Sequence, residues 1–310
     1  MSMALLAVVL VLLASHFFPA AAGTRRIAEG LAAWDRAVLG SASIAPHSWV
    51  GVFLRIGLPT LVVAAAQIAL LGQGFGLPSL VFGVLVLFLC WGPRDLDRDV
   101  ADALDDTRGA AQDEAARALG LPDAAQPWQQ VGPGLFHSAL SRWFGPLFWF
   151  IVLGASGAVL FRLTRLAAAA DQPAGSALRI CDRLLRWPVA QLICLALAVV
   201  GHFDRVVSAW QAWHRERPWL SWQEEPGFLD AAVAASIDPG ESARDQVEDA
   251  IDESASDDVP SEGEIEAAVA QKVRSAPHEL ALQAAHRTLW RVLAAWLVVL
   301  AVLVIAGVSS

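Results

Sequence analysis

The sequence predicts an all-α membrane protein that crosses the bilayer several times. Of its 310 residues 56% are apolar and 17% are charged, with a mean hydropathy of +0.49, whereas soluble domains carry about 25% charged residues. The apolar residues gather in long runs. Thirteen Trp and no Tyr fit many positions at a membrane interface, where an indole buries its face and keeps its N–H near head groups. We expect four to six membrane segments and interfacial amphipathic helices.

Residues 1–23 are predicted to form an N-terminal membrane anchor helix. Met1 to Phe18 is apolar and is followed by small residues that are typical of a signal-peptide cleavage site. A signal peptide also needs basic residues at its start, and none precedes Leu5. A retained anchor is therefore favoured, with a cleaved signal peptide as the alternative.

Residues 24–46 are predicted to hold an interfacial amphipathic helix. An apolar stripe recurs at helical spacing between Thr24 and Leu39, through Ile27, Leu31, Trp34 and Val38. A helix with such a stripe lies in the membrane surface.

Residues 47–93 are predicted to be a transmembrane helical hairpin. Val50 to Leu71 and Leu77 to Trp91 are apolar runs, joined by a tight turn at Gly72 to Gly76. About 20 residues are needed to cross the roughly 30 Å hydrocarbon core. A third clear run, Val292 to Val308, predicts a C-terminal transmembrane helix within 276–310.

Two further runs are ambiguous. Trp143 to Phe161 contains Pro146, Gly154 and Gly157, so it is predicted to be a kinked span or a re-entrant element. Trp187 to Gly201 is barely long enough to cross, and we expect Trp187-Pro188 to start its helix, since a first-turn Pro loses no hydrogen bond.

The basic residues predict an orientation. Arginines in segment 94–142 place it in the cytoplasm, with the N-terminus outside, by the positive-inside rule. Residues 162–186 hold five more arginines, which would face outward if both ambiguous runs crossed. An amphipathic surface helix at 176–186 would relieve part of this conflict, with Asp182, Arg183 and Arg186 on a polar face that meets anionic lipid. Four and six spans both remain open.

Residues 224–275 are predicted to be an acidic cytoplasmic loop. Glu224 to Glu266 holds 15 Asp and Glu against the single Arg244, which is too polar to bury. We expect it to be largely mobile, with a short helix near Glu262 to Ala276.

A charged cluster follows the hairpin at the membrane exit and begins the 94–142 segment, which is predicted to be helical. Its acids at 95, 99, 102 and 106 share one helical side and could hold a hydrated Mg²⁺, but pairing with Arg94 and Arg98 and with the helix dipole is favoured. The candidate contact residues for a nucleotide or protein partner are the members of this rim: Arg94, Asp95, Asp97, Arg98, Asp99 and Arg142.

No motif predicts catalysis, a metal or a cofactor. The seven histidines show no ligand spacing, and Walker loops, nucleophile elbows and Gly-rich dinucleotide turns are missing from the sequence. The expected partners are membrane lipids and a cytoplasmic or membrane protein, with no nucleic acid.

Three segments carry a family resemblance. They are Arg142 to Leu163 (RWFGPLFWFIVLGASGAVLFRL), Leu87 to Asp99 (LFLCWGPRDLDRD), and Cys181 to Trp213 with its Trp-Pro, apolar run and Gly-His. In these the sequence resembles the AmpE family, whose members are bacterial inner-membrane proteins linked to β-lactamase induction. The resemblance implies a multi-pass regulatory protein that responds to cell-wall antibiotics.

AmpE proteins are themselves similar to the CobD/CbiB synthases of cobalamin assembly, so residues 143–223 are predicted to be a CobD/CbiB-like membrane core. Those synthases carry Glu-Asn and Asp-Gly pairs before this core. Here His137 to Arg142 contains no acid, which favours a non-enzymatic descendant. A cobalamin amide synthase remains the alternative, and a transporter is a further one, because Gly and Pro interrupt the 143–161 run as in a discontinuous helix.

Overall fold

Helices make up every regular element that the structure, a computed structural model, describes. It describes residues 48–71, 76–90, 96–105, 107, 109–121, 127–170, 177–216, 227–253 and 261–306, together with isolated positions between 7 and 36. The predicted anchor over 1–23, the amphipathic helix over 24–46, and the rim residues Arg94 and Asp95 therefore lie outside the continuously described segments.

The α-helices in chain order are α3 (Trp49–Val52), α4 (Leu58–Leu70), α5 (Leu77–Cys90), α6 (Leu96–Leu104), α7 (Ala110–Leu119), α8 (Val131–Ala139), α9 (Gly145–Leu153), α10 (Ala155–Ala170), α11 (Ala177–Val200), α12 (Phe203–Glu216), α13 (Gly227–Ser236), α14 (Pro239–Glu253), α15 (Glu262–Ser275) and α16 (Pro277–Ile305). Two π-helices, η1 (Phe53–Gly57) and η5 (Leu140–Phe144), and a 3₁₀ helix, η4 (Trp128–Gln130), join some of them. The predicted all-α class is confirmed.

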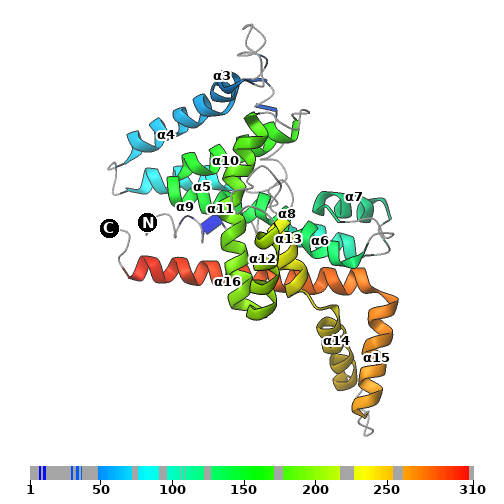
Figure 1. Cartoon of the computed structure of the whole chain (residues 1–310). Helices are drawn as coiled ribbons and strands as arrows, with labels where there is room; N and C mark the ends of the chain where they lie inside the picture. The colour runs from blue at the N-terminus through cyan, green and yellow to red at the C-terminus, as the bar shows by residue number, and fades with distance from the viewer. Residues whose placement is uncertain are drawn as a thin grey trace.

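The helices gather around a large hydrophobic core, and a second, smaller core lies between α3, η1, α10 and the start of α11. Helix α16 contacts α8, α11 and α14, whereas α4 packs against α10 and α5, away from α16 (Figure 1). Helices α6 and α7 pack against each other, and α6 also touches α16. Helices α14 and α15 project together away from the rest of the molecule (Figure 1). The core is filled by large side chains from distant segments, among them Phe136, Phe144, Phe161 and Phe228.

The three clear apolar runs are confirmed as helices. Trp49–Leu70 and Pro277–Val302 are each long and apolar enough to cross a membrane, and Leu77–Cys90 is a shorter apolar helix. Their outward faces carry exposed aliphatic side chains, including Val62, Ile68, Leu85 and Val299. Exposed apolar side chains of this kind are expected where lipid rather than water is the neighbour.

The run from 143 to 161 is broken at Gly154, as predicted. Helix α9 ends there and α10 begins at the next residue, with Gly154 at a φ of 70° and a ψ of −154°, a region that only glycine adopts readily. Gln67 of α4 spans the break: its amide nitrogen donates to the Leu153 carbonyl at 3.5 Å, and its oxygen accepts from the Ser156 N–H at 3.2 Å. One side chain thus supplies partners to both helix ends.

The predicted helix start at Trp187-Pro188 is wrong, since Pro188 lies inside the single helix α11. This helix joins the amphipathic segment to the apolar run and is long and apolar enough to span. The predicted orientation of its polar face is also wrong: Asp182 and Arg186 are buried, whereas Leu184 is exposed. Asp182 and Arg186 have protein partners, which stabilise burial better than lipid head groups would outside.

Residues 224–275 are mostly helical, so the expectation of a largely mobile loop is wrong. Helix α13 buries an apolar face that includes Phe228, Leu229 and Val233. Helix α14 packs on α16, where Asp245 pairs with Arg287 and Gln246 bonds to Gln283. The short helix predicted near 262–276 is confirmed as α15.

Helix α15 begins with a capping interaction. The Ser261 backbone N–H and hydroxyl both donate to Glu264 Oε2 at 2.8 Å. These two hydrogen bonds favour the ionised carboxylate and lower the pKa of Glu264 below its usual 4.5.

Candidate functional site

A buried ion pair joins the charged rim to the family-like segment. Arg142 lies in the π-turn η5, which interrupts the rod formed by α8 and α9, and π-turns inside helices are frequent at functional sites. Its Nη1 donates to Asp99 Oδ2 at 2.5 Å and its Nη2 donates to the Ala118 carbonyl at 2.6 Å. The Asp99 side chain is fully buried and that of Arg142 is 10% exposed. One guanidinium therefore holds α6 and the end of α7 against the rod.

A second contact joins α6 to α16. Asp97 Oδ1 lies 2.6 Å from His286 Nε2 and accepts a hydrogen bond from Trp290 Nε1 at 3.0 Å. The Trp290 ring also meets the edge of Trp143, with centroids 5.6 Å apart. Because Asp97 and Asp99 face different partners, α6 bridges the rod and the C-terminal helix.

The described rim residues therefore do not form a single cluster. Asp97, Asp99 and Arg142 take part in helix–helix contacts. Arg98 is exposed and forms no ion pair with another described residue. Arg94, Asp95 and Asp106 lie outside the described residues, so the predicted pairing within this cluster stays a prediction. The described segments show no cluster of three or more metal-binding side chains. Partner contact through the rim stays a prediction.

A longer chain of polar groups crosses the core through α13, α8, α11 and α10. Asp230 Oδ1 lies 2.6 Å from His137 Nε2, and His137 Nδ1 lies 2.8 Å from Arg186 Nη2. Arg186 in turn lies 3.9 Å from Asp182 Oδ2, which accepts from Arg165 at 2.9 Å. If His137 is neutral, Arg186 donates to Nδ1 and Nε2–H donates to Asp230, so this tautomer satisfies both neighbours.

Sequence reasoning missed this polar chain. It assigned Asp182 and Arg186 to a lipid-facing surface and gave His137 no role. The spacing of four residues between Asp182 and Arg186 predicts that the two side chains pair with each other, but it does not predict that the pair is buried. Ionisable groups inside an apolar helical assembly mark functional sites by default, although ion pairing alone identifies no reaction. Their geometry positions helices and can relay a shift between them.

The comparisons with known proteins decide the family. The family described as "Regulatory signalling modulator protein AmpE" matches residues 3–218. The chain belongs to the AmpE family. The match includes α3 to α12 and thus the Asp99–Arg142 pair, and it ends before α13. The AmpE assignment makes this a membrane protein of a regulatory signalling family, as the resemblance predicted.

One curated relative carries a different description. "Cobalamin biosynthesis protein CobD" of Chromobacterium violaceum is 33% identical over 109 residues, which are 33% of this chain and 34% of that protein. The chain thus matches about a third of the length of this relative. The similarity agrees with the kinship expected between AmpE proteins and the CobD/CbiB group. No solved structure matches the chain.

Proposed function

We propose that this chain is a multi-pass inner-membrane protein that modulates β-lactamase induction in response to cell-wall antibiotics, without catalysing a reaction. The observation that carries the proposal is the AmpE family match over residues 3–218. The polar contacts support a relay, because Asp97 and Asp99 tie α6 to both α16 and the rod. A movement of α16 or of the rod formed by α8 and α9 would therefore shift α6 and α7.

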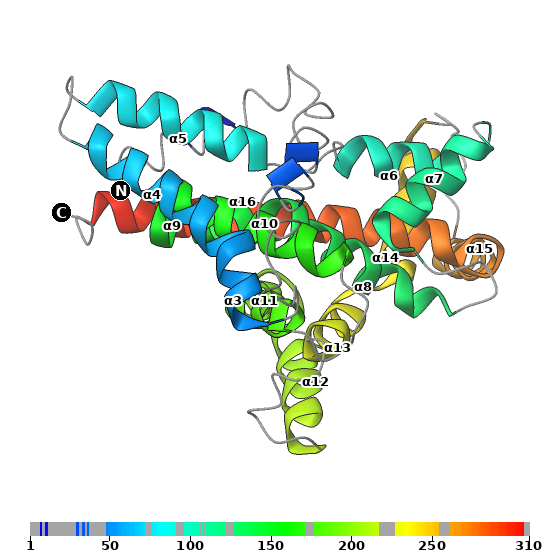
Figure 2. The ribbon, with the colours of Figure 1, turned by 90° about the horizontal axis from the view of Figure 1, so that it is seen from above.

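The membrane arrangement is part of this proposal. In Figure 1 α11 runs across α16, and Figure 2 looks nearly along α11 while α16 again lies across the view. Two helices that cross so steeply do not both stand upright in a bilayer. We assign α4, α5 and the C-terminal half of α16 to the membrane, with α11 along its surface and residues 94–142 and 224–275 in the cytoplasm.

Site-directed labelling tests this topology. Cys90, Cys181 and Cys194 are first replaced by Ala or Ser, and single cysteines are placed at exposed Arg98 and Glu248. A membrane-impermeant thiol reagent should label both positions only from the cytoplasmic side. Labelling of either from the periplasm in intact cells would overturn the assignment.

Gene deletion tests the regulatory role. A strain that lacks the protein should show altered β-lactamase induction by a β-lactam, and the wild-type chain should restore it. An Arg142→Gln variant should restore it poorly, whereas Arg215→Gln, at an exposed position outside the rim, should restore it fully. Normal induction in the deletion strain would remove the proposal.

The match to CobD favours one second candidate, a cobalamin amide synthase. The positions that precede the shared core hold His137 and Arg142, and both side chains already contact Asp partners within the protein. We therefore rank the enzyme below the regulator. Growth of a synthase-deficient strain that depends on corrin assembly distinguishes them, since rescue by this chain would support the enzyme.

A further inference from the structure

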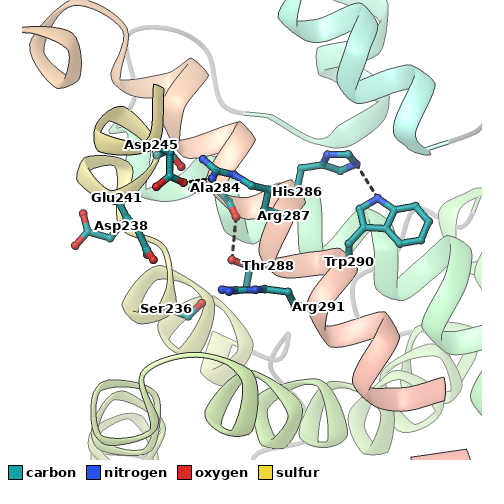
Figure 3. Close-up of a pocket in the computed structure, with 11 residues that line it drawn as sticks. Ser236, Asp238, Glu241, Asp245, Ala284, His286, Arg287, Thr288, Trp290 and Arg291 are labelled. Carbon is teal, nitrogen blue, oxygen red and sulfur yellow. Dashed lines mark hydrogen bonds and ion pairs between the residues drawn. The ribbon is translucent and has the colours of Figure 1, made fainter. Parts of the chain in front are cut away.

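A pocket of about 340 Å³ lies between α14 and α16, beyond the end of the AmpE match. The turn between α13 and α14 and the start of α14 form one wall, with Ser236, Asp238, Glu241 and Asp245. The facing wall is α16, with His286, Arg287, Thr288 and Arg291 (Figure 3). Its size falls in the range of small-molecule sites, and its walls carry opposite charges.

Most of the charged groups around the pocket already have partners. Asp245 pairs with Arg287, Asp238 lies 3.8 Å from Arg205, and His286 contacts Asp97. These pairs join α14 to α16, α12 to the α13–α14 turn, and α6 to α16. They hold the walls in place and leave little charge of either sign to be neutralised by a ligand.

Glu241 and Arg291 are the exception among the described pocket residues. Both are exposed, and neither forms a hydrogen bond or ion pair with another residue that the structure describes. Their side chains extend into the space between α14 and α16 from opposite sides (Figure 3). A lone carboxylate and a lone guanidinium on facing walls match a ligand that carries one positive and one negative group.

We propose that this pocket binds a small zwitterion of the amino-acid or short-peptide class. The ligand's carboxylate would bind Arg291, whose planar guanidinium suits a carboxylate in two-point contact. The ligand's ammonium would bind Glu241, with Asp238 nearby on the same wall. A single anion or cation would leave one of the two groups without a partner.

Titration calorimetry on the full-length protein in detergent tests the proposal. The probes are glycylglycine, its N-acetyl form and its C-terminal amide, which keep the same backbone and remove one charge each. Glycylglycine should bind with a Kd on the order of 1 mM, and each blocked form should bind at least about tenfold more weakly. Equal binding of all three, or no binding of glycylglycine near this concentration, would overturn the proposal.

Paired variants assign the two ends of the ligand. Glu241→Gln should abolish the preference over the N-acetyl form and keep the preference over the amide, and Arg291→Gln should do the reverse. Glu248→Gln and Arg244→Gln are controls on exposed positions of α14 outside the pocket and should change neither preference. If either variant weakened the binding of all three probes by the same factor, the assignment of the two ends would be contradicted. Because the readout is binding to purified protein, it is independent of β-lactamase induction.

Discussion

Arg142 donates to both Asp99 and the Ala118 carbonyl, so one guanidinium ties three helical segments together. The contact is buried, and removing one member of a buried ion pair leaves the other charge without compensation. Asp99→Asn and Arg142→Gln should each lower the free energy of unfolding by about 3–5 kcal/mol. Denaturant unfolding in detergent micelles, followed by Trp fluorescence, measures this change.

The control for this prediction is Arg98→Gln, on the same helix but exposed. It should change the free energy of unfolding by no more than about 0.5 kcal/mol. The double variant Asp99→Leu with Arg142→Met should recover much of the loss, since apolar pairs often replace buried ion pairs at little cost. Single variants as stable as the wild type would show that the pair contributes nothing.

Arg186 stands between His137 and Asp182 in the polar chain that crosses the core. Arg186→Gln should lower stability by about 2 kcal/mol, less than for Arg142, because Asp182 keeps its bond to Arg165. Thermal unfolding in detergent checks the change. Arg215→Gln, at an exposed position near the end of α12, is the control, and an equal effect of both variants would argue against a specific role for the chain.

Gly154 separates α9 from α10 at a backbone conformation that other residues rarely adopt. An added Cβ would also collide with the Gln67 side chain that bonds across the break. Gly154→Ala should therefore destabilise the protein by about 1–3 kcal/mol, as measured by thermal unfolding in detergent. Gly263→Ala in α15 should be neutral or stabilising, since a Cβ there meets nothing within 4 Å and Ala favours helix.

Local features such as the hairpin and the break at Gly154 could be predicted from the sequence. Each depends on nearby residues alone: the length of an apolar run and the positions of glycine and proline. The burial of Asp182 and Arg186 could not be predicted, since helix periodicity groups residues on a face without saying whether lipid or protein covers it. The apolar face of α13 was missed because the prediction for 224–275 was based on the acidic composition of the whole segment. It did not consider the spacing of Phe228, Leu229 and Val233, which form that face. The partners of Asp97 and Asp99 come from segments 43 to 193 positions away, and no local pattern predicts such contacts.

The capping contact between Ser261 and Glu264 predicts a pH dependence confined to α15. The hydrogen bonds lower the pKa of Glu264 below 4.5 in the folded protein, so their stabilising effect is present above pH 4.5 and is lost as the pH falls through the folded-state pKa. Hydrogen-exchange protection of the Glu264 and Ile265 amides, which both donate to the Ser261 carbonyl, should fall below pH 4.5 after correction for intrinsic rates. Glu264→Gln keeps an acceptor without a titrating group, so its protection should not change over this range. Glu262→Gln should retain the wild-type pH dependence, and a profile that is flat in the wild type would contradict the capping role.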